Sequence, residues 1–65
     1  MSDPMQVTIT ATLTEIQALA FAQFLKRVGL DGYRLLSADT DEAYAMQDAG
    51  EALRKALAEQ GYAPR

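Results

Sequence analysis

The chain has 65 residues, 49% hydrophobic and 23% charged, with a formal net charge of −3 and neither cysteine nor histidine. This length predicts a single domain spanning 1–65, and the composition is that of a folded chain and not of a disordered one. Without cysteine or histidine, disulfides and zinc, haem and iron–sulfur sites are effectively excluded. Calcium is disfavoured too, because residues 39–42 run into an apolar helix with no glycine turn and no distant glutamate at loop spacing. We therefore expect no cofactor and no metal.

The small size of the chain also predicts self-association. A domain this short buries barely enough surface to offset the entropy of ordering its backbone. Small domains usually add a disulfide, a metal or a second copy. Since a disulfide and a structural metal are not available to this chain, we expect a homodimer.

The first predicted element is a strand at about residues 5–11, because apolar and polar side chains alternate along it. One side carries Met5, Val7, Ile9 and Ala11, and the other carries Gln6, Thr8 and Thr10. No second segment of this kind follows, and a lone strand leaves its backbone groups unpaired. We therefore expect the strands of two copies to pair, with Met5, Val7 and Ile9 on the buried side.

A helix is predicted at about residues 14–28. Thr14 is a suitable N-cap, Gln17 stands where it would close a capping box, and Gly29 is a candidate stop. The apolar residues of this helix cover more than one side, so a single partner helix would not cover them.

An irregular connection is predicted at about residues 29–38, followed by a second helix at about 39–60. Asp39 as N-cap and Glu42 three residues later form its start signal. Gly50 lies on its apolar side, which fits either a close helix–helix approach or simple tolerance of glycine. The expected fold class is α+β: a strand-helix-helix protomer whose homodimer has an intermolecular two-stranded antiparallel sheet and four helices.

Nothing in the sequence indicates an enzyme. Ser2 and Ser37 have no histidine to activate them, and Asp39, Asp41 and Glu42 stand where helix N-termini normally carry acids. No phosphate-binding glycine loop occurs. We expect no catalytic site and no small-molecule substrate.

The apolar pattern also argues against a membrane protein. The longest apolar stretch, residues 16–25, is about half a membrane span and contains two glutamines. The first residues are polar and acidic, unlike a signal peptide. We expect a cytoplasmic protein without a membrane partner.

Charge is uneven along the chain and suggests a protein partner. Residues 31–51 carry six acids against Arg34 alone, a local net charge of −5. Clustered charge steers encounter with an opposite surface, so we expect an unidentified protein partner with a basic surface. A solvated acidic face is the alternative interpretation. The candidate binding residues are Asp31, Tyr33, Asp39, Asp41, Glu42, Tyr44, Asp48 and Glu51.

A second candidate function is DNA binding. The order strand, helix, helix is that of ribbon-helix-helix transcriptional regulators, in which paired strands enter the major groove. Gln6, Thr8 and Thr10 would then read bases. The acids at the start of the second helix would repel a phosphate there, which makes nucleic acid the less favoured partner.

Four runs of residues resemble a small uncharacterised proteobacterial family found on prophages and integrative elements. They are residues 9–14, 20–29, 41–44 and 56–65. The resemblance carries no catalytic or binding residues. It implies a context: small acidic proteins of mobile elements often inhibit or retune a host complex, as anti-CRISPR proteins do.

Overall fold

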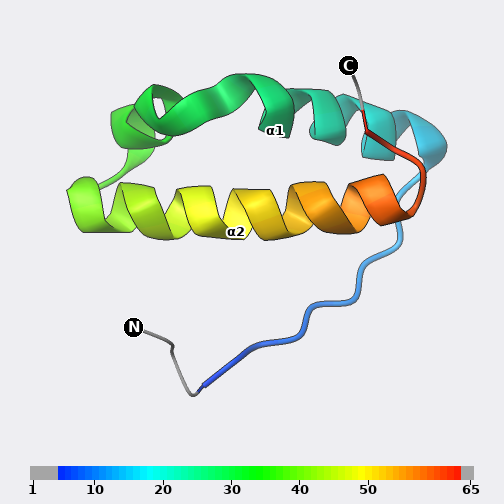
Figure 1. Cartoon of the computed structure of the whole chain (residues 1–65), viewed down its shortest axis with the longest axis horizontal. Coiled ribbons are helices and arrows are strands. Elements are labelled where there is room, and N and C mark those ends of the chain that lie inside the picture. Colours follow the sequence, from blue (N-terminus) through cyan, green and yellow to red (C-terminus); the bar gives the residue numbers. More distant parts are fainter. Residues whose placement is uncertain (1–4, 64–65) are drawn as a thin grey trace.

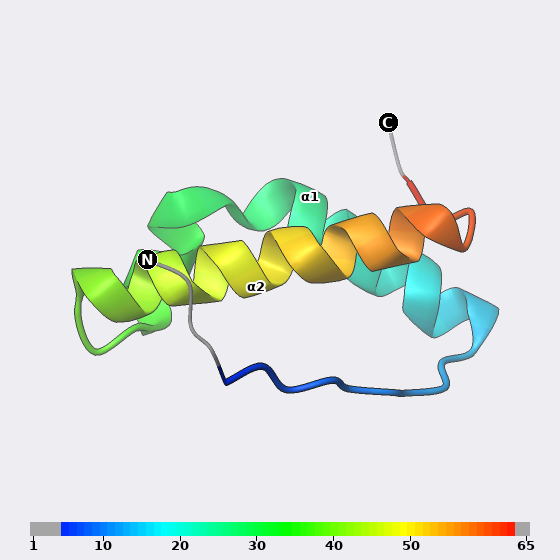
Figure 2. The same ribbon diagram turned by 60° about the horizontal axis from the view of Figure 1, so that its bottom comes forward.

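The computed structural model describes residues 5–63, and this part of the chain forms two helices and no strand. α1 spans Glu15–Leu36 and α2 spans Thr40–Glu59, with a short connection at residues 37–39. The two helices lie side by side as an antiparallel hairpin (Figure 1). Residues 5–14 lead into α1 as an extended, exposed N-terminal segment that runs back below the hairpin (Figure 2).

The predicted strand at residues 5–11 is therefore wrong, and with it the α+β class and the two-stranded intermolecular sheet. The described chain is all-α. Met5, Val7 and Ile9 are 77–84% exposed and no backbone ladder forms along them. Alternation of side chains gives a segment two distinct sides, but a strand also needs a partner to accept its hydrogen bonds.

α1 begins with a capping box. The Gln17 backbone N–H donates to Thr14 Oγ1 at 3.1 Å, and the Thr14 N–H donates to Gln17 Oε1 at 2.9 Å. These two bonds satisfy donors that the helix leaves unpaired at its start. The helix therefore begins where the sequence predicts.

Gly29 is a kink in α1 and not its end. Its backbone has φ 58° and ψ 175°, a conformation that glycine adopts readily and other residues do not. The helix resumes beyond it and ends at Leu36, so most of the predicted connection at 29–38 is helical. Glycine is a frequent helix stop, but four of the seven residues that complete α1 after Gly29 are good helix formers: Leu30, Arg34, Leu35 and Leu36.

α2 is closed at both ends by local hydrogen bonds. Asp39 Oδ1 accepts from the Glu42 N–H at 2.8 Å, and Glu42 Oε1 accepts from the Ala38 N–H at 2.8 Å. At the other end the Tyr62 N–H donates to the Leu57 carbonyl and the Gly61 N–H to the Ala58 carbonyl, each at 2.9 Å. With Gly61 at φ 98°, this is a Schellman motif.

The contact between the helices is made by small residues. The buried residues of the described chain are Ala18, Ala22 and Leu25 in α1 and Ala43 and Gly50 in α2. A Cβ on Gly50 would collide with the Tyr33 hydroxyl oxygen and would lie 3.0 Å from Tyr33 Cζ and 3.5 Å from Leu25 Cδ2. Of the two interpretations of Gly50, the structure therefore supports the close helix–helix approach.

We predict that Gly50→Ala lowers the free energy of unfolding by about 1–2 kcal/mol, because the added methyl group overpacks the contact with Tyr33. In an unobstructed helix interior the same change would stabilise by roughly 1 kcal/mol, so the sign is diagnostic. Urea unfolding followed by circular dichroism measures it. In a Tyr33→Phe background the penalty should shrink, since the nearest atom is gone. A stabilising Gly50→Ala would contradict the close approach.

Candidate interaction surface

The most distinctive surface of the molecule is an apolar groove of about 730 Å³ between the helices and the N-terminal segment. The N-terminal segment contributes Ile9, Ala11 and Leu13, and α1 contributes Gln17, Ala20, Phe21 and Phe24. α2 and its C-cap contribute Leu53, Ala56, Leu57 and Gln60. None of these residues is charged.

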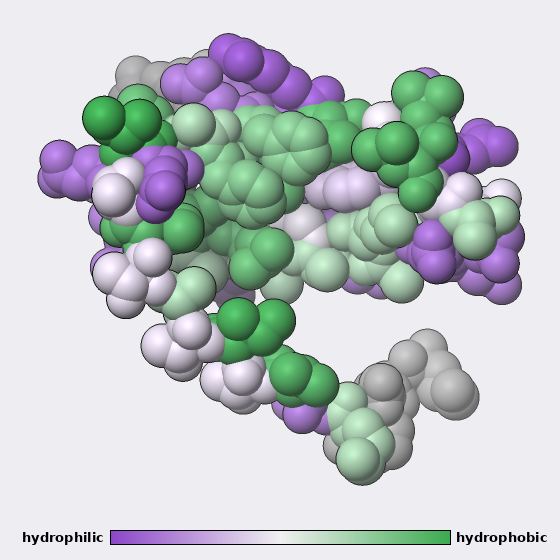
Figure 3. All heavy atoms as spheres, turned by 180° about the vertical axis from the view of Figure 1, so that it is seen from behind, coloured by the Kyte–Doolittle hydropathy of each residue, from purple (hydrophilic) through white to green (hydrophobic). Residues whose placement is uncertain are grey.

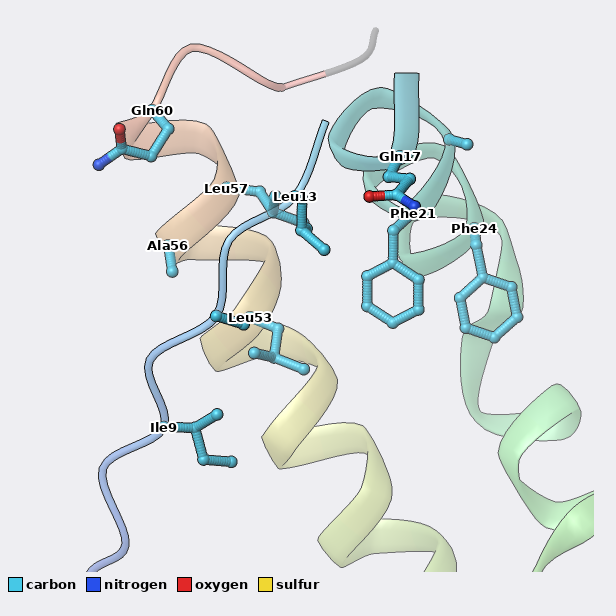
Figure 4. A pocket seen from close by; sticks show the side chains of 11 residues that line it. Ile9, Leu13, Gln17, Phe21, Phe24, Leu53, Ala56, Leu57 and Gln60 are labelled. Carbon is cyan, nitrogen blue, oxygen red and sulfur yellow. The ribbon is translucent and has the colours of Figure 1, made fainter. Parts of the chain in front are cut away.

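The groove has two sides with side chains directed into the space between them. Ile9 and Leu53 lie on one side, and Phe21 and Phe24 lie on the other (Figure 4). The two phenyl rings are stacked, with centroids 5.4 Å apart and planes 24° apart. A stacked pair of this kind contributes about 0.5–1.5 kcal/mol beyond the burial of its area.

These large side chains remain accessible to water. Phe21 is 41% exposed, Phe24 49% and Leu53 44%, while Ile9 is 77% exposed. Figure 3 shows hydrophobic residues gathered where the two helices meet and continuing onto the N-terminal segment. Contiguous apolar patches of this kind often mark contact sites.

Several predicted acidic binding residues are used by the fold itself. Asp39 and Glu42 hold the start of α2 through the bonds described above. Glu51 lies 3.9 Å from Arg54 in an exposed ion pair. Asp31, Asp41 and Asp48 are exposed, and in the described part of the chain their carboxylates make no hydrogen bond or ion pair.

The structure separates the two tyrosines that the sequence singles out. Tyr33 is partly buried and packs across Gly50, so its ring belongs to the helix contact. Tyr44 is 50% exposed near the start of α2 and is not among the groove residues. Only Tyr44 is presented to solvent as an aromatic anchor would be.

The N-terminal candidates divide in the same way. Ile9 reaches the groove, whereas Met5 and Val7 are exposed further along the segment and do not line it. Gln6, Thr8 and Thr10 are exposed as well, but no strand holds them in the arrangement that a ribbon-helix-helix protein uses to read bases.

Phe21, Phe24 and Leu53 are not among the surface residues that the sequence predicts, because apolar residues within a helix are expected to face a neighbouring element. A signal was present. The apolar arc on the first helix is broader than one neighbouring helix can cover. The apolar residues that α2 leaves uncovered line the groove.

No described helix is long and apolar enough to cross a membrane. Within residues 5–63, no group of three or more acidic side chains is placed to hold a metal ion.

Comparison with protein families gives one match that spans the whole chain. The model of DUF7706, a family of unknown function, matches residues 1–65. No curated protein and no solved structure matches the chain.

We predict that Asp39→Ala lowers the free energy of unfolding by about 1 kcal/mol, because the Glu42 N–H loses its acceptor at the start of α2. Asp48→Ala is the matched control: Asp48 is exposed within the same helix, so its loss should change stability by less than about 0.5 kcal/mol. Thermal unfolding of both variants makes the comparison. Equal effects would show that the acids of α2 act only through overall charge.

Proposed function

The chain belongs to the DUF7706 family, whose function is unknown, and we propose that it is a non-enzymatic protein-binding module that contacts its partner through the apolar groove. The observation that carries this proposal is the exposure of Phe21, Phe24 and Leu53 on one continuous face. Aromatic residues are enriched in the cores of protein interfaces. Removing their apolar surface from water is favourable and drives association.

The composition of the groove favours a protein over a small molecule. Small-molecule sites place a few polar groups to orient the ligand within an apolar pocket. Here the polar side chains of the lining are Gln17 and Gln60, and Gln17 already accepts the Thr14 N–H in the capping box. A broad apolar surface with few polar groups to orient a ligand is better matched by the apolar surface of another protein.

The acidic surface has a secondary role in this proposal. Asp31, Asp41 and Asp48 are free of local bonds in the described chain, so their charges are available to attract a basic partner. Such charges raise the rate of encounter more than the strength of the final complex. In this proposal the groove provides the affinity for the partner, and the acidic side chains raise the rate at which the partner associates.

We extend the proposal to a biological context, that of an inhibitor or modulator of a host complex encoded by a mobile element, as an anti-CRISPR protein is. Its support is the resemblance of the four residue runs to a prophage-associated family, together with the small size and acidic charge of the chain. DNA binding stays a prediction. It relied on paired strands, and no feature of the described hairpin favours it.

The groove is tested by capture from a lysate of the host with tagged wild-type chain and two variants. Phe24→Glu places a charge in the groove and should reduce the captured partner by at least about tenfold, since buried unpaired charge is costly. Leu36→Glu is the matched control, because Leu36 is 85% exposed and outside the groove. Circular dichroism must show both variants helical. Equal capture by Phe24→Glu and wild type would contradict the proposal.

The acids are tested by replacing Asp31, Asp41 and Asp48 together with asparagine, which changes the formal net charge from −3 to 0. The association rate with the captured partner should fall by about tenfold at low salt and converge with wild type at high salt. Surface plasmon resonance across a salt series measures it. Asp39 and Glu42 are kept so that the cap of α2 is intact. If the association rate at low salt is the same for the variant and the wild type, these acids form a solvated surface without a role in binding.

A further inference from the structure

We propose that the groove is filled by a second copy of this chain, so that two hairpins form one apolar core. This inference rests on the proposed function, because it takes the same groove as the contact surface and names a second copy, in place of a host protein, as its occupant. It concerns helix packing and does not involve strand pairing.

The first argument is the small size of the core within one copy. Its buried residues are three alanines, one glycine and one leucine, and no large side chain is fully buried. Burial of large apolar side chains is the dominant favourable term in folding. A chain of 65 residues without cysteine has no disulfide to stabilise it. Association with a second copy is a common way for so small a domain to bury more apolar surface.

The second argument is area. Taking roughly 200 Å² for a large apolar residue, the exposed fractions of Ile9, Leu13, Phe21, Phe24 and Leu53 leave about 500 Å² open on the groove face. A stable interface buries about 800 Å² on each partner, and in homodimers about 65% of that is apolar. The groove therefore offers the apolar area that one side of such a dimer requires.

The third argument is charge. Each copy carries a formal net charge of −3, so an interface through a charged face would be repulsive. The groove residues include no charged side chain, so two copies can meet there without placing acids together.

The groove is also suited to a two-fold arrangement. In a symmetric dimer each surface patch meets the same patch on the other copy. A two-fold axis through the groove sets the Phe21–Phe24 pair of one copy against Leu53 and Leu57 of the other, and the reverse. Ile9 and Leu13 then cover the edge, which brings the N-terminal segment into the interface.

Sedimentation equilibrium and light scattering of the full chain at tens of micromolar test this assignment. We expect twice the monomer mass of 7.1 kDa. The thermal unfolding midpoint of the wild type should rise with concentration, because association stabilises the folded state by mass action. This second measurement needs no variant, so it holds even where a groove substitution prevents folding.

Leu53→Glu should weaken self-association by at least about 30-fold, the loss typical of a central interface residue. Leu36→Glu, which changes the same residue type outside the groove, should stay dimeric. A monomer at tens of micromolar with a midpoint independent of concentration overturns the second copy as occupant. So does a dimer that Leu53→Glu leaves unchanged.

The results that would contradict the proposed function differ from those that would contradict the second copy as occupant. If the chain is monomeric and Phe24→Glu abolishes capture of another protein, the groove binds that protein and only the second-copy assignment is overturned. If groove substitutions alter neither self-association nor capture, both proposals are overturned.

Discussion

The close packing of α1 on α2 through alanine and glycine is the constraint on which the rest of the structure depends. Small residues let the two backbones approach, and Gly50 leaves room for the Tyr33 ring across the contact. Leu25 also packs into this contact. Phe21, Phe24 and Leu53, in contrast, stay 41–49% exposed and line the groove.

The start signals of both helices were readable from the sequence, whereas the end of the first helix and the tertiary partner of each segment were not. Thr14 with Gln17 and Asp39 with Glu42 predicted the helix starts, since capping bonds form between neighbours in the chain. The error at residues 5–11 has the opposite cause. Side-chain alternation is local, but a strand exists only with a second strand, and the described chain provides none. Gly29 was misread because glycine serves equally for a kink and for an end.

The groove was partly foreseeable from the same pattern. The excess breadth of apolar residues on the first helix indicated that one neighbour would not cover it, but not which residues would remain exposed. That depended on the rotation of α1 against α2, which the alanine and glycine contact decides. The acidic residues were predicted as a group for their charge. The structure divides them into Asp39 and Glu42, which cap a helix, and Asp31, Asp41 and Asp48, which do not.

The kink at Gly29 gives α1 two mechanically separate parts. Gly29 has non-helical dihedral angles, so two helical segments meet at this residue. None of residues 30–36 is buried, and Leu35 and Leu36 are 85% exposed. Short helical pieces with few buried contacts open at low free energy. The amide protons of this last part of α1 should therefore exchange with solvent before those of residues 18–25.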